Sequence, residues 1–367
     1  MTSLILLAIV ISGYSQVYGY PQAAPYSLVR NYSGQTFFDS FDFYSKPDPA
    51  SSFVQYVDIH TANDSAFAGF VDYVYTDDMN QTRSVDKLVY LGVDFTTNTT
   101  SGRESVRMEA SETFNHSLIV ADIYHMPGGC GVWPAFWLLG TGLPWPQAGE
   151  IDVLEGINDQ ALNRMSLHTD KQLVLDNNTH AGLTVSRPGC DLRQQGQTLS
   201  SDCNVGTSGG TGCSIMGVNA TSQGFGSRFN AVHGGYLVTE FTNEWIKIWQ
   251  MDRSTGDVVF SNNVQTNLGI GRMRSWGPPT ALFSRNGTNL SSYFMNLQMI
   301  FNTAFCGPWI DGTWSSSACT SLAPTCQEYV ASNPSAFVDA YWLIKGVYMY
   351  QTNSNSTDQS SAKLKRT

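Results

Sequence analysis

Charged residues are scarce in this chain, since Asp, Glu, Lys and Arg make up only 14% of its 367 residues, against about 25% in typical soluble domains. The balance is acidic, with 20 Lys and Arg against 30 Asp and Glu, so the formal net charge at pH 7 is −10. No basic cluster is present that could neutralise phosphate groups. We therefore expect no nucleic-acid partner and no attraction to anionic membranes.

Long apolar runs are also missing, since no segment approaches the roughly 20 residues that a membrane-spanning helix needs. Residues 4–11 form a short apolar run, followed by polar residues and by Gly19 at a suitable cleavage position. This pattern is typical of a secretory signal peptide over residues 1–19, with a buried N-terminal strand as the alternative. The C-terminal KLKRT has no apolar tail, so we expect no membrane anchor. The expectation is a secreted, extracellular protein, free or associated with a cell wall.

Asn-X-Ser/Thr sequons, the acceptor sites for N-linked glycans on secreted proteins, are frequent in the chain. They lie at Asn31, Asn63, Asn80, Asn98, Asn115, Asn177, Asn219, Asn286, Asn289 and Asn355. Because Ser and Thr are abundant, we expect several of these to be chance matches. The sequons support secretion without indicating which of them carry a glycan.

No Cys-X-X-Cys pair is present among the 7 cysteines, which argues against a zinc site. An odd number of cysteines leaves at least one without a partner in the same chain. One group, in a stretch rich in Gly and Ser, consists of Cys190, Cys203 and Cys213; a second consists of Cys306, Cys319 and Cys326, and Cys130 stands apart. We expect disulfides within each group, tying long loops, while the connectivity stays open. We expect no metal and no cofactor.

Patterns typical of β-strands dominate the sequence. In residues 293–301 apolar residues alternate with polar ones such as Asn296 and Gln298, which is the period-two pattern of a half-exposed strand. Residues 245–251 and 257–260 flank a Gly-containing turn and predict a hairpin. Further strands are predicted at residues 105–110, 118–124 and 342–350.

Only one helix is predicted, a short one from Asn333 through Asp339, where Asn is the cap and Pro334 stands in the first turn. Many short strands separated by turns predict an all-β sandwich or barrel. No repeat and no interdomain linker is visible, so residues 20–351 are expected to form one domain. Residues 170–230 are loop-like and too long for an idle connection, and the polar residues 352–367 predict a disordered tail.

The stretch GEIDVLEG, residues 149–156, holds three carboxylates at uneven spacing. On a regular strand Glu150 and Asp152 would share a face, and Glu155 would point to the other face. A helix would separate the two Glu side chains by about 140°, and the flanking Gly residues and the β-branched Ile151 and Val153 favour a strand. A β-bulge, which absorbs one extra residue, would return Glu155 to the face of the other two acids.

Three acids on one face repel one another, and glycoside hydrolysis is the chemistry that uses such an arrangement. Two carboxyl groups flank the scissile bond, one as nucleophile and one as acid, about 5–5.5 Å apart in retaining enzymes. Nearby negative charge raises the pKa of the acid and keeps it protonated. A solvated acidic strand and a calcium site are the alternatives; calcium would need more oxygen ligands close by than these apolar neighbours offer.

Tryptophans approach these acids along the sequence. Trp133, Trp137 and Trp145 stand 17, 13 and 5 residues before Glu150. The C–H faces of sugars pack on indole rings, although core packing is the ordinary explanation for a single Trp. Trp145 lies between two prolines in a loop, where core packing is harder to arrange, and we favour it as a binding residue. Trp133 shares strand parity with Trp137 and is a weaker candidate.

The runs WPAFWLLG (133–140), WPQAGEIDVLEGIN (145–158) and SLHTD (166–170) strongly resemble glycoside hydrolase family 16, and its fungal laminarinase-like endo-1,3(4)-β-glucanases in particular. The resemblance continues through IFNTAFCGPW (300–309) and NPSAFVDAYWLIKGVYMYQ (333–351), and so covers nearly the whole mature chain. It implies a β-jelly-roll sandwich of two curved antiparallel sheets with a concave substrate cleft.

The resemblance also implies roles for individual residues. Glu150 would be the nucleophile, Glu155 the acid/base and Asp152 the supporting acid between them. His168 stands where the family has a cleft histidine that supports the acids. Trp137 and Trp145 match sugar-contacting tryptophans of the family.

The resulting hypothesis is a secreted endo-acting enzyme that hydrolyses 1,3- or 1,3-1,4-β-glucans with retention of configuration, acting as a monomer on its polysaccharide. A cell-wall β-glucan transglycosylase is the alternative, because the same two Glu residues would serve when a sugar hydroxyl replaces water. A non-catalytic β-glucan-binding protein ranks lower, because the chain keeps both Glu residues. Linkage preference depends on cleft loops that residue types do not specify.

Overall fold

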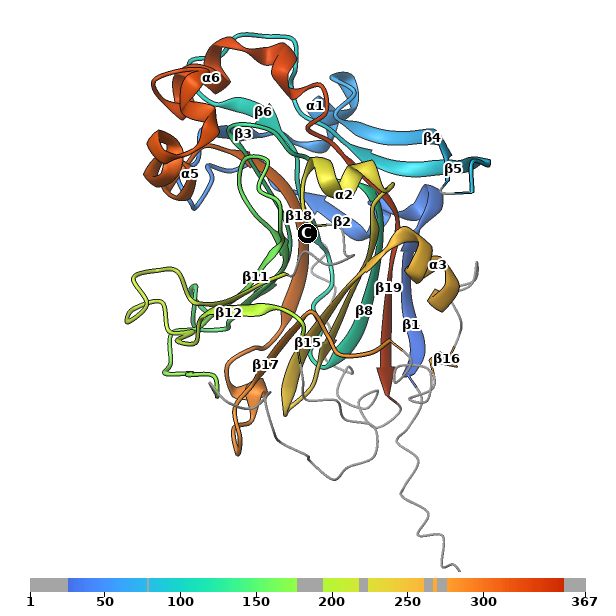
Figure 1. Ribbon diagram of the computed structural model, residues 1–367, viewed down its shortest axis with the longest axis vertical. Helices are drawn as coiled ribbons and strands as arrows, with labels where there is room; N and C mark the ends of the chain where they lie inside the picture. Colours follow the sequence, from blue (N-terminus) through green and yellow to red (C-terminus); the bar gives the residue numbers. More distant parts are fainter. Residues whose placement is uncertain are drawn as a thin grey trace, which may run out of the picture.

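The protein is a sandwich of two large, twisted β-sheets (Figure 1). The computed structural model describes residues 26–77, 79–176, 194–217, 224–260, 267–268 and 276–352. The expected signal peptide and C-terminal tail lie outside these ranges, as do Cys190 and the sequons at Asn177, Asn219 and Asn355. The other sequon asparagines are all exposed. No helix in the described ranges has the length and apolar character needed to cross a membrane.

Every pairing within the two large sheets is antiparallel. The first sheet runs in the order β16 (Asn267–Leu268), β1 (Tyr26–Ser33), β19 (Trp342–Thr352), β8 (Ser117–His125), β14 (Gly235–Phe241), β15 (Trp245–Asp252) and β17 (Ala281–Ser284), and β5 (Thr82–Leu91) pairs with β19 and with β4 (Ala68–Thr76). The second runs in the order β12 (Gln197–Ser200), β13 (Cys213–Met216), β11 (Arg164–His168), β10 (Glu150–Glu155), β9 (Val132–Gly140), β18 (Leu297–Phe305), β7 (Arg107–Ala110) and β2 (Phe41–Phe43).

Smaller elements surround the sandwich. Strands β3 (Val54–Tyr56) and β6 (Arg103–Ser105) form a parallel pair. The helices are α1 (Ile59–Asp64), α2 (Ser227–Ala231), α3 (Arg253–Phe260), α5 (Pro308–Thr313) and α6 (Cys326–Ser332), with short 3-10 segments at Gly34–Thr36, Phe38–Ser40, Leu290–Ser292, Trp314–Ser316, Ala318–Ser321 and Pro334–Phe337.

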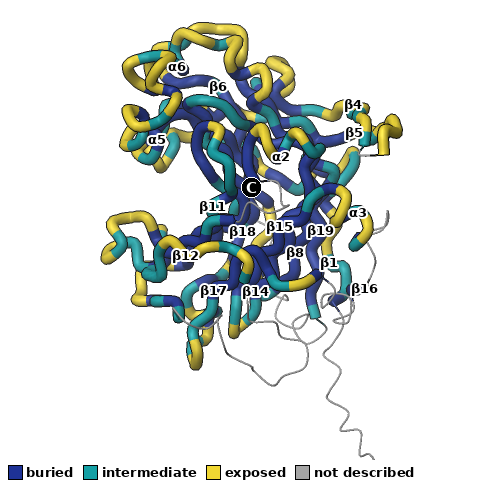
Figure 2. Tube along the Cα trace, in the orientation of Figure 1, coloured by how far each residue is buried: buried dark blue, intermediate teal, exposed yellow. Residues whose placement is uncertain are grey.

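The main core lies between the two sheets, and Figure 2 shows that the central strands of the sandwich are deeply buried. Alternate residues of the second sheet point into it, among them Leu138, Ile151, Met165, Leu167, Met299 and Phe301, all fully buried. The first sheet contributes Ile119, Leu237, Ile248 and Val347 among others. Burying each such side chain stabilises the fold by about 1.5–3 kcal/mol. This packing fixes which face of the second sheet points inward, and so leaves the opposite face for the site.

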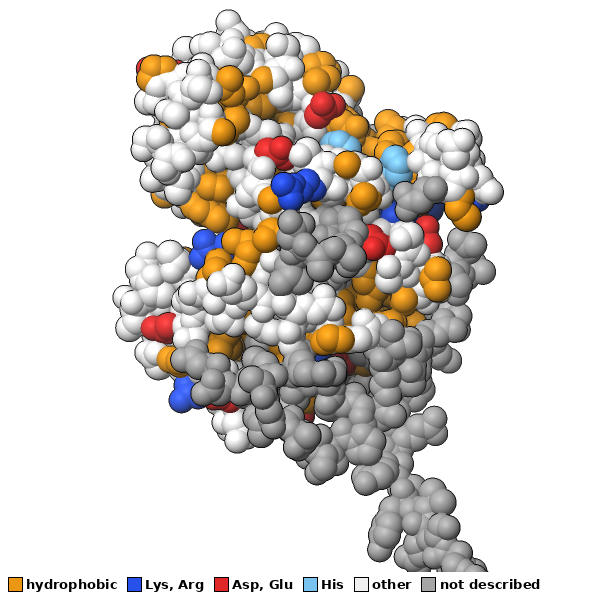
Figure 3. Space-filling view, in the orientation of Figure 1, with side chains coloured by type: hydrophobic (Ala, Val, Ile, Leu, Met, Phe, Trp, Pro, Cys, Tyr) orange, Lys and Arg blue, Asp and Glu red, His pale blue; other side chains and the backbone are white. Residues whose placement is uncertain are grey.

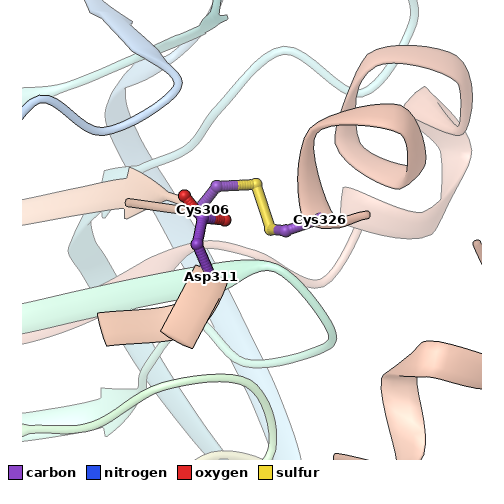
Figure 4. A group of neighbouring side chains, drawn as sticks. All are labelled: Cys306, Asp311 and Cys326. Atoms are coloured by element: carbon purple, nitrogen blue, oxygen red, sulfur yellow. A yellow bond between two sulfur atoms is a disulfide. The ribbon is translucent and has the colours of Figure 1, made fainter. Parts of the chain in front are cut away.

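A second hydrophobic cluster lies under a lobe that contains α5 and α6, at the upper left of Figure 1. Two disulfides tie this lobe: Cys306–Cys326 joins β18 to α6 (Figure 4), and Cys130–Cys319 joins it to the chain before β9. A third, Cys203–Cys213, closes the loop before β13. The expected pairing within each group is therefore confirmed for two bonds and wrong for Cys319, because packing of the lobe brings Cys130, 189 residues away, beside it.

Several predicted elements differ from the structure. The strand expected at residues 293–301 begins only at Leu297, because Leu290–Ser292 forms a 3-10 turn and Asn296 has a positive φ of 51°. The hairpin expected at 245–260 is wrong in its second half. Residues 245–252 are strand β15, but residues 253–260 form helix α3.

The start of α3 has a clear physical cause. The Asp252 carboxylate accepts a hydrogen bond from the Thr255 amide at 2.6 Å, which is the interaction that caps a helix. The Arg253 guanidinium donates to the buried Asp122 carboxylate on β8 at 2.5 Å. A local cap and a long-range ion pair thus override the strand-like pattern of residues 257–260.

Helix α6 and the elements within the expected long loop were not predicted. Helix α6 precedes the expected helix, which is itself only a 3-10 turn over Pro334–Phe337. The Thr325 hydroxyl accepts a hydrogen bond from the Glu328 amide, and the Thr-X-X-Glu spacing is a capping signature that the sequence contains. The stretch expected as loop at 170–230 contains β12, β13 and α2.

Candidate active site

The uneven spacing of the three acids is resolved by a bulge in β10. Asp152 lies opposite Trp137 of β9 and Leu154 lies opposite Phe136, so Val153 is the extra residue. The side chains of Ile151, Val153 and Leu154 are all fully buried in the core between the sheets. The expected bulge is confirmed, and it returns Glu155 to the outer face.

All three acids consequently share one face of the sheet. Their partners on β9 are Leu139 for Glu150, Trp137 for Asp152 and Ala135 for Glu155. These partners are two residues apart, and residues two apart on a strand point to the same side. The acids therefore lie on the outer face of the second sheet, opposite to the core.

The side chain of Asn163 holds the bulge. Its Oδ1 accepts a hydrogen bond from the Glu155 amide at 2.9 Å, and its Nδ2 donates to the Val153 carbonyl at 2.8 Å. Asn163 is completely buried. A bulge leaves backbone groups without ladder partners, and this one amide side chain satisfies two of them. The sequence analysis did not identify Asn163, because its burial and its two partners are set by the pairing of β10 with β11.

His168 lies beside the acids on the neighbouring strand β11. It pairs with Glu150 across the strands. Its Nε2 is 3.2 Å from Asp152 Oδ2 and 3.8 Å from Glu150 Oε1. His168 thus contacts two of the three acids, as the sequence analysis expected.

Each of the two glutamates receives a hydrogen bond from an indole. Trp145 Nε1 donates to Glu150 Oε2 at 2.9 Å, and Trp133 Nε1 donates to Glu155 Oε1 at 3.0 Å. Trp145 keeps 53% of its surface exposed, so its ring is free for contact with a ligand. The structure brings Trp133, which the sequence left as a weaker candidate, into direct contact with Glu155.

Trp137 lies on the same face, on β9 and directly opposite Asp152. Its Nε1 donates to Asn302 Oδ1 at 2.8 Å, and the Arg107 guanidinium lies 5.1 Å from its ring centre. Arg107 is also 2.7 Å from the carboxylate of Glu109. The sequence analysis did not select Arg107 or Asn302, because no local motif distinguishes them.

The face that carries these residues is indented. Figure 3 shows a notch in the left outline of the molecule, below the lobe with α5 and α6. From the lobe, Trp309 reaches the cleft face: its ring lies 5.7 Å from that of Trp133, at 87°. The lobe therefore forms one wall beside the Glu155 end of β10.

Burial keeps the three carboxyl groups protonated to unusually high pH. Desolvation, together with the charge of Asp152, raises the pKa of Glu150 and of Glu155 to about 8. Desolvation raises the pKa of Asp152 itself to about 7, against a lowering influence of Arg164. Because the groups interact, they titrate as one coupled site rather than singly.

Two groups of side chains in the described ranges have the proximity that metal binding needs. In the first, Cys306, Asp311 and Cys326, the two sulfurs are bonded to each other, so they offer no thiolate (Figure 4). The second is the set Glu150, Asp152 and His168 of the cleft.

A β-sandwich with clustered, partly protonated carboxyls and tryptophans on an indented outer face defines a carbohydrate-cleaving enzyme. A model described as an XgeA-like catalytic domain of glycoside hydrolase family 16 matches residues 41–350. The chain belongs to this family and is a glycoside hydrolase.

The names of similar proteins agree with this assignment. The chain is 38% identical to an endo-1,3(4)-β-glucanase of Arthroderma benhamiae over 93% of its own length and 68% of the relative's. It is 32% identical to an endo-1,3(4)-β-glucanase, xgeA, of Emericella nidulans, of which it covers only 48%.

Solved structures share the fold. Laminarinase 16A from Phanerochaete chrysosporium, with β-glucans in donor and acceptor sites, has a TM-score of 0.75 at 33% identity; the alignment covers 89% of this chain and 100% of that one. An elongating family 16 β-1,3-glucosyltransferase has a TM-score of 0.72 at 32% identity, with the same coverage. The expected jelly-roll sandwich is confirmed.

The role of Asn163 in holding the bulge can be tested with Asn163→Ala. The substitution leaves Val153 O and Glu155 N without partners, and each unsatisfied buried group costs about 1–3 kcal/mol. Turnover should fall about 100-fold, the effect of misplacing a reacting group by about 1 Å. Asn158→Ala, which removes a buried hydrogen bond to Gly131 outside the bulge, is the matched control. Equal rate losses in both variants, measured at equal folded fraction, would contradict the role of Asn163.

The raised pKa of Glu150 predicts a pH-dependent cost in stability. The pKa of Glu150 is higher in the folded state, about 8, than in the unfolded state, near 4. The folded protein therefore loses stability as the pH rises through this range, because ionisation of Glu150 is easier in the unfolded chain. Glu150→Gln cannot ionise, so its Tm should exceed that of the wild type at pH 8 and match it near pH 4. The gain should be about 2 °C for each kcal/mol recovered. Calorimetry at both pH values measures it, with the exposed Glu112→Gln as control; a gain that is equal at both pH values would refute the prediction.

Proposed function

We propose that the protein is a secreted endo-β-glucanase that hydrolyses 1,3- or 1,3-1,4-linked β-glucans with retention of configuration. The observation that carries the proposal is the bulge at Val153, which gives Glu150 and Glu155 the same cleft face. The printed names of the relatives, endo-1,3(4)-β-glucanase and laminarinase with bound β-glucans, support β-glucan as the substrate class.

In this proposal Glu150 is the nucleophile and Glu155 the acid/base. Glu155 gives its proton to the leaving glycosidic oxygen while Glu150 attacks the anomeric carbon, and water activated by Glu155 then releases the sugar. The raised pKa of Glu155, about 8, supports its role as a proton donor, because the group then still carries its proton at neutral pH. The hydrogen bond from Trp145 to Glu150 favours its ionised form, which a nucleophile needs.

Asp152 and His168 support these two residues. Asp152 raises the pKa of both glutamates when it is charged. His168, 3.2 Å from Asp152, offsets part of that repulsion when it is protonated. Trp145, half exposed beside Glu150, offers a stacking surface next to the bond to be cleaved, and Trp137 extends the aromatic floor across β9.

The domain limits and the location outside the cell are part of the same proposal. Residues 20–351 would form the catalytic domain, behind a signal peptide at 1–19 and before a disordered tail. Three disulfides support an oxidising compartment, and the exposure of the sequons in the described ranges is compatible with glycosylation. We expect the enzyme to act as a monomer without a cofactor.

A second candidate is a β-glucan transglycosylase. It is favoured by the similarity to a solved elongating β-1,3-glucosyltransferase at 32% identity. The chemistry is identical up to the covalent intermediate, and only the attacking hydroxyl differs. Hydrolysis ranks first because the two named relatives of which this chain covers 68% and 70% are a glucanase and a probable glycosidase.

The assignment of the two glutamates predicts the behaviour of their variants. Glu150→Ser and Glu155→Gln should each lower the release of reducing sugar from laminarin by 10³-fold or more, on the order of 4 kcal/mol in the barrier. Binding of laminarin, measured by calorimetry, should persist, because the tryptophans remain. Glu112→Gln, at an exposed ion pair with Arg30 on the opposite sheet, should keep wild-type turnover. Full turnover in either cleft variant would rule out its role.

Retention predicts the first product of each cleavage. Double displacement should release the β-anomer, which proton NMR of fresh laminarin digests detects before mutarotation. An initial α-anomer would overturn the mechanism. Mass spectrometry of the same digests, started from a defined laminari-oligosaccharide, should contain no chain longer than the substrate. Longer products would assign the transglycosylase instead.

A further inference from the structure

Arg164 is the first residue of β11 and lies beside the Glu155 end of β10. Across the two strands His168 pairs with Glu150 and Ser166 with Asp152. Arg164 continues that alternation on the cleft face, while Met165 between them is fully buried in the core. The backbone pairing therefore brings one guanidinium to the acid/base end of the carboxylate row.

A chain of contacts joins Arg164 to Glu155. The guanidinium carbon lies 5.1 Å from the centre of the Trp309 ring. Trp309 meets Trp133 edge to face at 5.7 Å, and Trp133 Nε1 donates to Glu155 Oε1 at 3.0 Å. Arg164 thus packs against the wall that holds the Glu155 carboxyl.

Within the described part of the chain, no carboxylate lies within salt-bridge distance of Arg164. Its Nε is buried without a hydrogen-bonding partner there. Arg107, the other arginine stacked on a cleft tryptophan, is by contrast 2.7 Å from Glu109. The acids that Arg164 influences are Asp152 and Glu155, whose pKa values it lowers.

We infer that Arg164 is a positioning residue of the acid/base step, which stabilises the Glu155 carboxylate left when the proton moves to the leaving oxygen. In that step the O–H bond of Glu155 breaks and its electron pair stays on the carboxylate. The proton binds the glycosidic oxygen, which keeps the electron pair of the broken bond to the anomeric carbon. In the second step the same carboxylate takes a proton from water. The inference rests on the proposed function, because it assumes that Glu155 is the acid.

Other charges near Glu155 are accounted for. Glu150 and Asp152 lie on its own strand, and His168 and Arg164 lie on β11. Trp133, which donates to Glu155 from β9, and Trp309 of α5, which lies behind Trp133, carry no charge. Arg164 is the guanidinium among these groups, and a guanidinium stays protonated in proteins.

The first test is the pH profile of kcat/KM on laminarin. Arg164→Met removes the charge and should raise the pKa of Glu155, so the alkaline limb moves to higher pH. At the optimum kcat/KM should fall about tenfold, because the conjugate base is less stable. Arg164→Lys keeps the charge and should keep the limb of the wild type. Arg107→Met is the matched control. The alkaline limb of its pH profile should stay at the wild-type pH, whatever the substitution does to KM.

The second test removes the need for an acid. With 2,4-dinitrophenyl β-laminaribioside the leaving group departs without a proton, so kcat/KM of Arg164→Met should stay within about twofold of the wild type. A tenfold loss on both substrates, or an unmoved alkaline limb in Arg164→Met, would overturn the inference and leave a merely structural residue. Arg164→Gln is a second neutral variant if the Met variant does not fold.

The wild-type measurements separate the two proposals. Wild-type enzyme should lose its alkaline limb on the dinitrophenyl substrate. If it keeps that limb, or does not cleave laminarin, the assignment of Glu155 and the proposed function fail. If the wild type behaves as expected and the Arg164 variants do not, the inference alone fails.

Discussion

The site depends on one surplus residue in one strand. Val153 has no partner on β9, and its side chain stays in the core, so the chain reaches Glu155 with the face restored. Asn163 makes this possible because its amide satisfies both the Val153 carbonyl and the Glu155 amide. Without Asn163 the strand would lose two buried hydrogen bonds, and the orientation of the Glu155 side chain would no longer be fixed.

The burial that fixes the orientation of the three acids also makes their ionisation unfavourable. Three neighbouring carboxyls with little access to water prefer their neutral forms, which raises their pKa values to about 7 or 8. Their ionisation at neutral pH therefore opposes folding, whereas the proposed mechanism requires Glu150 to be ionised and Glu155 to keep its proton. The large core between the sheets offsets this cost, which is typical of active sites that trade stability for chemistry.

The cleft is built by two parts of the protein that differ in construction. The floor comes from the second sheet, where residue alternation fixes each side chain by register. The wall at the Glu155 end comes from the lobe with α5, which has its own hydrophobic cluster and is tied by Cys130–Cys319 and Cys306–Cys326. Trp309 on that lobe meets both Trp133 and Arg164. The disulfides thus help to hold a tryptophan of the lobe against the end of the carboxylate row.

The sequence by itself determined the class of fold, the bulge and the three acids, because alternation, glycines and the uneven Glu-X-Asp-X-X-Glu spacing are all local properties. Local signals also predicted β8, β15 and β19, and the Thr-X-X-Glu cap of α6 was present although unused. Only the tertiary structure decided the rest. The helix after β15 follows from the ion pair of Arg253 with Asp122 on a distant strand. Three further contacts also depend on packing and strand register, which the spacing of residues along the chain does not reveal. They are the bond of Cys319 to Cys130, the hydrogen bonds of Asn163 to the bulge, and the packing of Arg164 on Trp309 beside Glu155.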